Sequence, residues 1–490
     1  MKKHFIDLFT YRWRYVLGYG ALILMLIVAI LIAGLYAPGG LSLAEIKSIA
    51  PIYSWSAEAL AIPNLPLKIL QTGIFSLFGV SILTIKLPSI ILAIVTSLAI
   101  FFLLRRWFKP NVAIPAMLIM VTTGQYLFTA QSATANILYV LYSALILLFA
   151  SLILQKAKHA LLWKIGLALS LALSLYTPYL VYINLGLLIV ACIHPHTRYH
   201  ILRRSARLHW LIAASIFALF LIPLVYLCSV SPDLLGDLLG LNNLAHIDII
   251  SGIKTLLFTY FWITPIVANS QIIPILDFAA LAIAILGLIV LFQQRHSART
   301  YMIVAWTILT LPLLIIDPKL TAIITVPLII ILSVGFEALL REWYKLFPKN
   351  PYARGVGLIF TSALIGIMVL SGIDQFMNGY RFMPAAAREF QADVTLVNAQ
   401  VKERPVRTLL LVSDDELPLY TAIAHYNYPG IELAVATDTM NDTIGNVIVT
   451  RAAREQVPLQ GWELQGIITN DRYEDGDRLY LYKAPTHKVQ

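Results

Sequence analysis

The chain has 490 residues, of which 59% are hydrophobic and only 13% charged, so it is too apolar for a soluble globular protein. Its net charge of +10 does not indicate nucleic-acid binding, because the basic excess lies in the apolar part: residues 1–373 carry 25 lysines and arginines against 10 acids, whereas 374–490 carry 11 against 16. Apolar runs of about 20 residues, the length that crosses a bilayer as a helix, follow one another through the first part. We therefore expect a polytopic α-helical membrane protein with membrane lipids, and no nucleic acid, among its partners.

The sequence predicts about 11 spans. The first, at 16–36, follows a basic N-terminus and has no clear cleavage signal, so we interpret it as an uncleaved span. An amphipathic stretch, Leu67–Gly79, precedes the second. The other ten spans are expected at 80–104, 110–127, 137–154, 161–176, 179–193, 209–228, 275–292, 301–316, 320–340 and 355–373.

The distribution of basic residues predicts the orientation. With the N-terminus in the cytoplasm, 20 of the 25 lysines and arginines of residues 1–373 lie inside. Cytoplasmic loops carry such an excess, so this orientation is favoured. The basic residues left outside are Lys47, Lys68, Lys86, Lys254 and Lys319. An odd number of spans then places the C-terminal region outside the cytoplasm, and we expect an inner or plasma membrane location.

Residues 374–490 differ from the rest in composition and pattern. After a helical periodicity at 388–403, strand-like runs at 407–412, 431–436, 446–450 and 477–483 alternate with a helix at 417–426. This alternation predicts a small extracytoplasmic α/β domain after a membrane domain of residues 1–373. Ser413-Asp414-Asp415-Glu416 is interpreted as a helix N-terminus rather than a metal site.

Glu45 is the first carboxylate predicted to face outside, in the first outer loop at 37–66. A group-transfer enzyme at that face needs a carboxylate to deprotonate an acceptor hydroxyl and cations to hold a leaving phosphate. However, Ser42-Leu43-Ala44-Glu45 also matches the capping-box pattern S/T-x-x-E, in which the glutamate only starts a helix. From the local sequence the two roles are equally favoured.

Lys68 and Lys86 are the candidate cations for a lipid phosphate, and snorkelling at the membrane boundary is the alternative for both. The secondary acid candidates are Glu58, Asp233 and Asp237. Asp233 and Asp237 lie one helical turn apart, a spacing that is also typical of a solvated loop helix. The spacing of potential ligands predicts no metal site, and participation of a divalent cation stays open.

The order of features in residues 37–106 resembles that of a known family. The features are Pro38-Gly39-Gly40-Leu41-Ser42-Leu43-Ala44-Glu45, then Asn64-Leu65-Pro66, Leu77-Phe78-Gly79-Val80-Ser81, Lys86-Leu87-Pro88-Ser89 and Arg105-Arg106. This order is similar to that of the type C (GT-C) membrane glycosyltransferases of the protein mannosyltransferase and aminoarabinose transferase superfamily. By layout, the resemblance extends through the remaining spans and the C-terminal domain.

The resemblance implies a GT-C fold and an inverting transfer of sugar from a polyprenyl-phosphate donor to a lipid, glycan or protein acceptor at the non-cytoplasmic face. It implies that Glu45 is the catalytic base or organises the acceptor, and that Lys86, with Lys68, faces the lipid phosphate. The chain departs from the family at Ala44, where relatives carry a second acid, and at 128–136, which has neither acid nor arginine.

Three alternatives to an active transferase remain open. The first is a catalytically inactive relative, which the departures at Ala44 and at 128–136 would explain. The second is a transporter or flippase for lipid-linked saccharides, although such proteins usually carry charged residues within their spans. The third is a scaffold that presents the outer domain.

Overall fold

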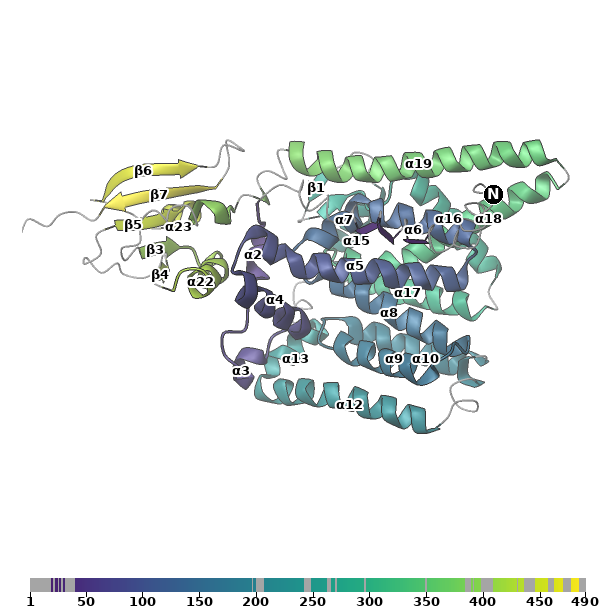
Figure 1. Ribbon diagram of the computed structural model, residues 1–490, viewed down its shortest axis with the longest axis horizontal. Coiled ribbons are helices and arrows are strands. Elements are labelled where there is room, and N and C mark those ends of the chain that lie inside the picture. The colour runs from purple at the N-terminus through teal and green to yellow at the C-terminus, as the bar shows by residue number, and fades with distance from the viewer. Residues whose placement is uncertain are drawn as a thin grey trace, which may run out of the picture.

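The computed structural model describes residues 40–483, except 196, 200–206, 242–247, 262–265, 269–270, 295–296, 349, 384–388, 391, 398–408, 430, 436–445, 457–461 and 470–476. Before residue 40 it describes only residues 19, 20, 23, 24, 26, 27 and 30, so most of the predicted first span lies outside the described residues. The molecule is elongated. Its long helices lie side by side in one bundle, and a small sheet domain sits beyond one end of that bundle (Figure 1).

Helices occupy each of the ten later predicted spans. These helices are α5 (Ile82–Trp107), α6 (Pro110–Thr122) with α7 (Gly124–Gln131), α8 (Asn136–Leu154), α9 (Ala160–Ser174), α10 (Leu180–Ile193), α12 (Arg207–Val230), α16 (Phe278–Gln293), α17 (Ala298–Ile316), α18 (Thr325–Leu346) after the 3₁₀ turn η1 (Thr321–Ile324), and α19 (Pro351–Phe382). The chain is thus a multi-pass helical membrane protein.

Not all of these helices are long enough to cross a membrane. Six of the described helices are long and apolar enough to cross a membrane, or seven if α6 and α7 form one broken span. By contrast, α9, α10 and α16 have only 15, 14 and 16 residues, short of the roughly 20 that a perpendicular crossing takes. The total of about 11 spans therefore stays a prediction.

The bend between α6 and α7 has a local cause. The two helices meet at 61°, and Thr123 has extended backbone dihedrals at the break. Its hydroxyl accepts a hydrogen bond from the Tyr126 N–H as the N-cap of α7 and donates one to the Met120 carbonyl. A single residue therefore ends one helix and starts the next, which the hydrophobicity of 110–127 does not reveal.

Helices α16 and α18 pack closely, because glycines face each other. A Cβ atom on Gly287 would collide with the Ile331 carbonyl, and one on Gly335 would collide with the Ile283 carbonyl. Small residues let helix backbones approach in this way in membranes. The main apolar core lies along this contact and extends to α5, α6 and α8.

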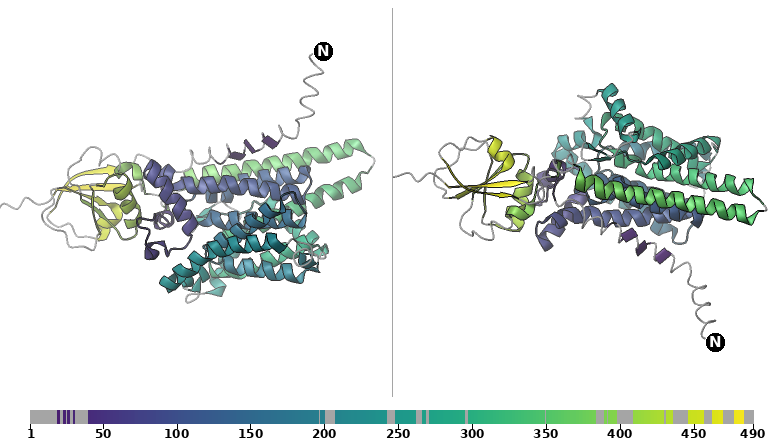
Figure 2. Two further views of the ribbon diagram at one scale, coloured as in Figure 1. Left: turned by 60° about the horizontal axis from the view of Figure 1, so that its bottom comes forward. Right: turned by 90° about the horizontal axis from the view of Figure 1, so that it is seen from above.

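Short elements cover the end of the bundle that faces the sheet domain (Figures 1 and 2). They are α2 (Leu43–Lys47), α3 (Ala57–Leu60), α4 (Leu65–Phe78), α13 (Pro232–Leu239), α15 (Ile249–Phe261) and the hairpin β1 (Ile266–Ala268) with β2 (Gln271–Ile273). The amphipathic stretch predicted at Leu67–Gly79 is α4. It ends at Gly79, which has a positive φ of 71°.

The C-terminal domain is a five-stranded mixed sheet in the order β4-β3-β5-β7-β6. Its strands are β3 (Leu409–Val412), β4 (Glu432–Val435), β5 (Asn446–Thr450), β6 (Glu463–Thr469) and β7 (Arg478–Lys483), with helices α22 (Leu417–Tyr426) and α23 (Arg451–Gln456). Strand β3 runs parallel to β4 and β5, and β7 runs antiparallel to β5 and β6. The predicted strands and the helix at 417–426 are confirmed, whereas β6 and α23 were not predicted. Of the helix predicted at 388–403, the structure describes a short turn at 394–397, and much of the rest lies outside the described residues.

The sheet domain docks on the bundle through specific contacts. The backbones of Leu41 and Ala392 exchange two N–H···O hydrogen bonds, with N···O distances of 2.9 and 3.3 Å. The Asn427 side chain accepts from the Val80 N–H at 2.7 Å and donates to the Val80 carbonyl at 2.8 Å. One apolar core runs from α2 and α4 into β3 and α22. The two domains are therefore packed as one body at this end.

Candidate functional site

Glu45 lies in α2 and forms the complete capping box that its spacing predicts. Its Oε2 accepts from the Ser42 N–H at 2.9 Å, while its own N–H donates to the Ser42 hydroxyl at 3.2 Å. This exchange satisfies two backbone donors that the start of a helix otherwise leaves unpaired. The structural role of Glu45 is thus confirmed, and the glutamate is buried.

The same carboxylate makes two contacts outside α2. Its Oε1 accepts from the Ala133 N–H at 3.0 Å, and the Lys86 Nζ lies 3.9 Å from that oxygen. Ala133 follows α7, and Lys86 lies in the first turns of α5. A capping box needs neither contact. Glu45 therefore joins α2 to the loop after α7 and holds the buried Lys86 side chain beside it.

Lys68 and Lys86 hold the two ends of the α2 segment. Lys86 donates to the Gly40 carbonyl at 3.4 Å, before α2, and Lys68 donates to the Ser48 carbonyl, at its end. Both side chains are buried, so neither snorkels into solvent. Burial lowers the pKa of Lys68 to about 8. The structure thus brings Glu45 and Lys86 together and places Lys68 on the same loop.

The secondary acid candidates lie on other elements. Glu58 is exposed on α3, and Asp233 and Asp237 are exposed on α13. Apolar side chains of α3 and α13 share a small core that excludes Glu45. The Glu45 carboxylate instead contacts Ser42, Ala133 and Lys86, so Glu45 and Lys86 form the central pair of the site.

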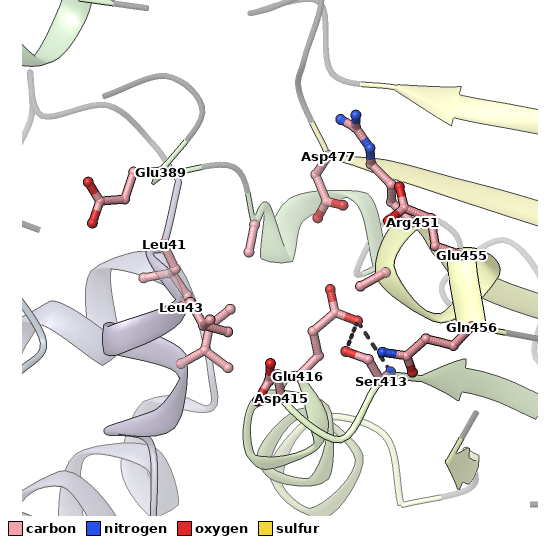
Figure 3. A pocket seen from close by; sticks show the side chains of 13 residues that line it. Leu41, Leu43, Glu389, Ser413, Asp415, Glu416, Arg451, Glu455, Gln456 and Asp477 are labelled. Carbon is pink, nitrogen blue, oxygen red and sulfur yellow. Dashed lines mark hydrogen bonds between the residues drawn. The ribbon is translucent and has the colours of Figure 1, made fainter. Parts of the chain in front are cut away.

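A cavity of about 390 Å³ lies between part of α2 and the C-terminal domain (Figure 3). Leu41, Leu43 and Ile46 form its apolar wall. The opposite wall is polar, and Figure 3 shows Glu416 and Asp477 there, both in the C-terminal domain. Since Ile46 follows Glu45 directly, this cavity adjoins the helix that carries the candidate base.

Burial, together with the nearby carboxylates Glu416 and Asp393, raises the pKa of Asp477 to about 7. A hydrogen bond of 2.9 Å from the Asp393 N–H to Asp477 Oδ2 acts in the opposite direction. Glu416 in turn accepts from the Ser413 and Thr450 hydroxyls, at 3.1 and 2.6 Å. The predicted helix start at 413–416 is correct, since α22 begins at Leu417.

The described residues contain no group of three or more histidine, cysteine, aspartate or glutamate side chains that could hold a metal ion. Participation of a divalent cation therefore stays untested.

Sequence reasoning missed the contribution of the loop after α7. The stretch 128–136 has no acid and no arginine, and its contacts come from the backbone: the Ala133 N–H to Glu45 and the Ala133 carbonyl, which accepts from the Ser48 hydroxyl at 3.0 Å. Every residue except proline has an amide of this kind. No side-chain pattern could have identified it.

The arrangement of the helix bundle, the short helices at its end and the C-terminal domain matches known structures. ArnT from Cupriavidus metallidurans bound to undecaprenyl phosphate superposes with a TM-score of 0.58 over 95% of this chain and 98% of its own, at 12% identity. The chain has the GT-C fold.

Further comparisons agree with this fold. The apo form of the same ArnT gives a TM-score of 0.56 at 12% identity, again covering 95% of this chain and 98% of that one. The Archaeoglobus fulgidus oligosaccharyltransferase tethered to an acceptor peptide gives 0.52 at 11% identity over 86% of this chain, which spans 64% of that protein's length. The family model of dolichyl-phosphate-mannose-protein mannosyltransferase matches residues 66–226. A comparison with curated sequences gives no match. The resemblance predicted from residues 37–106 is thus confirmed.

Proposed function

We propose that this GT-C protein is a membrane glycosyltransferase that moves a sugar from a polyprenyl-phosphate donor to an acceptor at the non-cytoplasmic face. The observation that carries the proposal is the buried pair of Glu45 in α2 and Lys86 in α5, which the loop after α7 also contacts through Ala133, in a fold that matches ArnT over nearly the whole of both chains. The orientation inferred from the basic residues places this end of the bundle, with the C-terminal domain, outside the cytoplasm.

In the proposed reaction Glu45 is the general base. It takes the proton of an acceptor hydroxyl as that oxygen attacks the anomeric carbon of the sugar. The bond from that carbon to the phosphate oxygen breaks, the configuration inverts, and polyprenyl phosphate leaves. Fixed cations stabilise the charge that develops on such a leaving group. Lys86 is the cation nearest to Glu45, and Lys68 is the second candidate.

The contacts of Glu45 show which of its oxygens can accept a further hydrogen bond. Oε2 is occupied by Ser42, whereas Oε1 accepts one backbone hydrogen bond and lies 3.9 Å from Lys86, beyond hydrogen-bonding distance. A carboxylate oxygen accepts two hydrogen bonds, so Oε1 has capacity for an acceptor hydroxyl. In the proposed reaction the acceptor hydroxyl donates to Oε1 beside the Lys86 ammonium.

Donor turnover in proteoliposomes tests the proposal. Purified protein receives a labelled polyprenyl-phosphate sugar with and without candidate lipid, glycan and peptide acceptors, and free polyprenyl phosphate is measured. A transferase releases the lipid phosphate in step with labelled acceptor. Movement of intact donor across the bilayer without turnover identifies a flippase instead. If the protein neither turns over the donor nor moves it across the bilayer, a scaffold or an inactive relative remains.

A purely structural role is the second candidate for Glu45, and the complete capping box favours it. Two substitutions separate the roles. Glutamine also fits the last position of a capping box, so Glu45→Gln keeps the cap and removes the base. Ser42→Ala removes the cap and keeps the carboxylate. Catalysis by Glu45 predicts that Glu45→Gln abolishes transfer while Ser42→Ala mainly lowers stability. A purely structural role predicts that Glu45→Gln, which keeps the cap, retains transfer.

A further inference from the structure

A second cavity, of about 350 Å³, lies at the other end of the bundle. It is lined by the end of α5, the end of α8 and the start of α17. The start of α5 adjoins Val80, which contacts the C-terminal domain, so the end of this 26-residue helix is remote from that domain and from Glu45 (Figure 1). This cavity is therefore separate from the proposed catalytic site.

The charged residues that line this cavity are two arginines, Arg106 and Arg299, and no carboxylate lines it in the described part of the chain. Arg299 is oriented by two contacts: its Nη1 donates to the Trp107 carbonyl at 3.5 Å, and its guanidinium lies 4.9 Å from the centre of the Phe108 ring. Both contacts leave guanidinium N–H groups available, because arginine has five donors. Glu337 acts on Arg299 electrostatically but lines a neighbouring cavity instead.

The N-terminus of α17 adds to this positive potential. Ser297 is the N-cap residue and makes no side-chain capping bond, and both Ser297 and Ala298 line the cavity. A helix N-terminus attracts anions through its unpaired N–H groups and its dipole. The two arginines and the helix terminus therefore favour the same ligand charge.

The remaining wall is apolar and comes from membrane helices. Leu147, Ala150 and Leu154 of α8 and Met302 of α17 line it. The head-group region of a phospholipid fits both surfaces. Its phosphate oxygens face the arginines, and its glycerol and first acyl carbons face the aliphatic side chains. Basic pockets between membrane helices on the cytoplasmic side recognise lipid head groups in this way.

We propose that this cavity is a phosphate-binding site that takes the head group of an anionic phospholipid. Arg106 and Arg299 bind the phosphate oxygens, and the first turn of α17 contributes backbone N–H groups. The site does not depend on the proposed transferase activity.

Lipid retention in nanodiscs tests this site. The full-length protein is reconstituted in phosphatidylcholine with or without phosphatidylglycerol, released into mild detergent, and its bound lipids are counted by native mass spectrometry. Wild type is expected to retain phosphatidylglycerol over phosphatidylcholine. Replacing one arginine, as in Arg106→Gln or Arg299→Gln, is expected to weaken this retention roughly five- to tenfold, the scale of about one charge contact at a membrane surface.

Arg341→Gln is the matched control, because Arg341 lies outside this cavity at the end of α18, is exposed and pairs with Glu342 at 3.3 Å. It removes the same charge and should retain lipid as wild type does. Arg106 is exposed, so its substitution tests the site even if Arg299→Gln fails to fold.

A parallel arm identifies the carrier of the phosphate by titrating inorganic phosphate into detergent-solubilised wild type and both arginine variants. One contrary result is that inorganic phosphate stabilises the protein only when both arginines are present, while phosphatidylglycerol is not selectively retained. This result would overturn the assignment of a lipid ligand and identify a soluble phosphate ligand instead. Equal retention of phosphatidylglycerol by wild type, Arg106→Gln and Arg299→Gln would overturn the site itself.

Discussion

Coupling between Glu45 and Lys86 is the energetic basis of the proposed site, and a double-mutant cycle measures it. The side chains are only 2% and 11% exposed, and their charged atoms lie 3.9 Å apart. Coulomb's law gives an attraction of about 4 kcal/mol at this distance for an effective dielectric constant of about 20. Desolvation of both charges offsets part of this attraction, so we expect a coupling energy of about 1–3 kcal/mol.

The cycle uses Glu45→Gln, Lys86→Met and the double variant. Each single variant leaves one buried charge without its partner, which costs roughly 3–5 kcal/mol when a buried pair is broken. Unfolding free energies are measured by SDS titration in mixed micelles, with Ser42→Ala as a control that disturbs α2 but leaves both charges in place. The double variant should be less destabilised than the sum of the single ones. Additive effects within about 0.5 kcal/mol would refute the claim that the two residues form a functional pair.

Three further predictions follow from the docked domain and the bundle. Burial raises the pKa of Asp477 from its ordinary value of 3.8 to about 7. The folded domain then binds more protons than the unfolded chain between about pH 4 and 7. Its stability should therefore fall by on the order of 4 kcal/mol as the pH rises through this window. Melting temperatures measured across this pH range should show the decrease, and Asp477→Asn should remove it. Asn427→Ala removes two hydrogen bonds to Val80 and should destabilise the docking of the C-terminal domain by about 1–3 kcal/mol. Faster proteolysis of that domain would show this loss, and unchanged proteolysis would contradict the docked arrangement. Gly287→Ala places a methyl group against the α18 backbone and should lower the melting temperature, unlike Gly366→Ala, where the added carbon meets nothing within 4 Å.

Much of the fold could be predicted, because helical membrane proteins reveal their spans as long apolar runs. Helices were found at the ten later predicted spans for this reason, and the helix predicted at 417–426 is also confirmed. The break at Thr123 could not be predicted, since it depends on one hydroxyl that serves two helices within a continuous apolar run. Strand β6 was missed because it is an edge strand with mostly exposed side chains, so its sequence carries little burial pattern.

The candidate site could be predicted only in part. The spacing of Ser42 and Glu45 predicts the capping box, which needs only four consecutive residues. That Lys86 lies beside Glu45 depends on how α2 packs against α5, and the Ala133 contact depends on where α7 ends. Both are tertiary facts with no local signal. The same holds for the pKa of Asp477, since its neighbours Asp393 and Glu416 are distant in sequence.

The most direct test of the central claim is transfer from a labelled polyprenyl-phosphate sugar by purified wild type, Glu45→Gln and Ser42→Ala in proteoliposomes, each checked for folding by its melting temperature. We predict that wild type transfers the sugar, that folded Glu45→Gln does not, and that Ser42→Ala retains transfer at temperatures below its own melting point. Full activity of Glu45→Gln would contradict the assignment of Glu45 as the base.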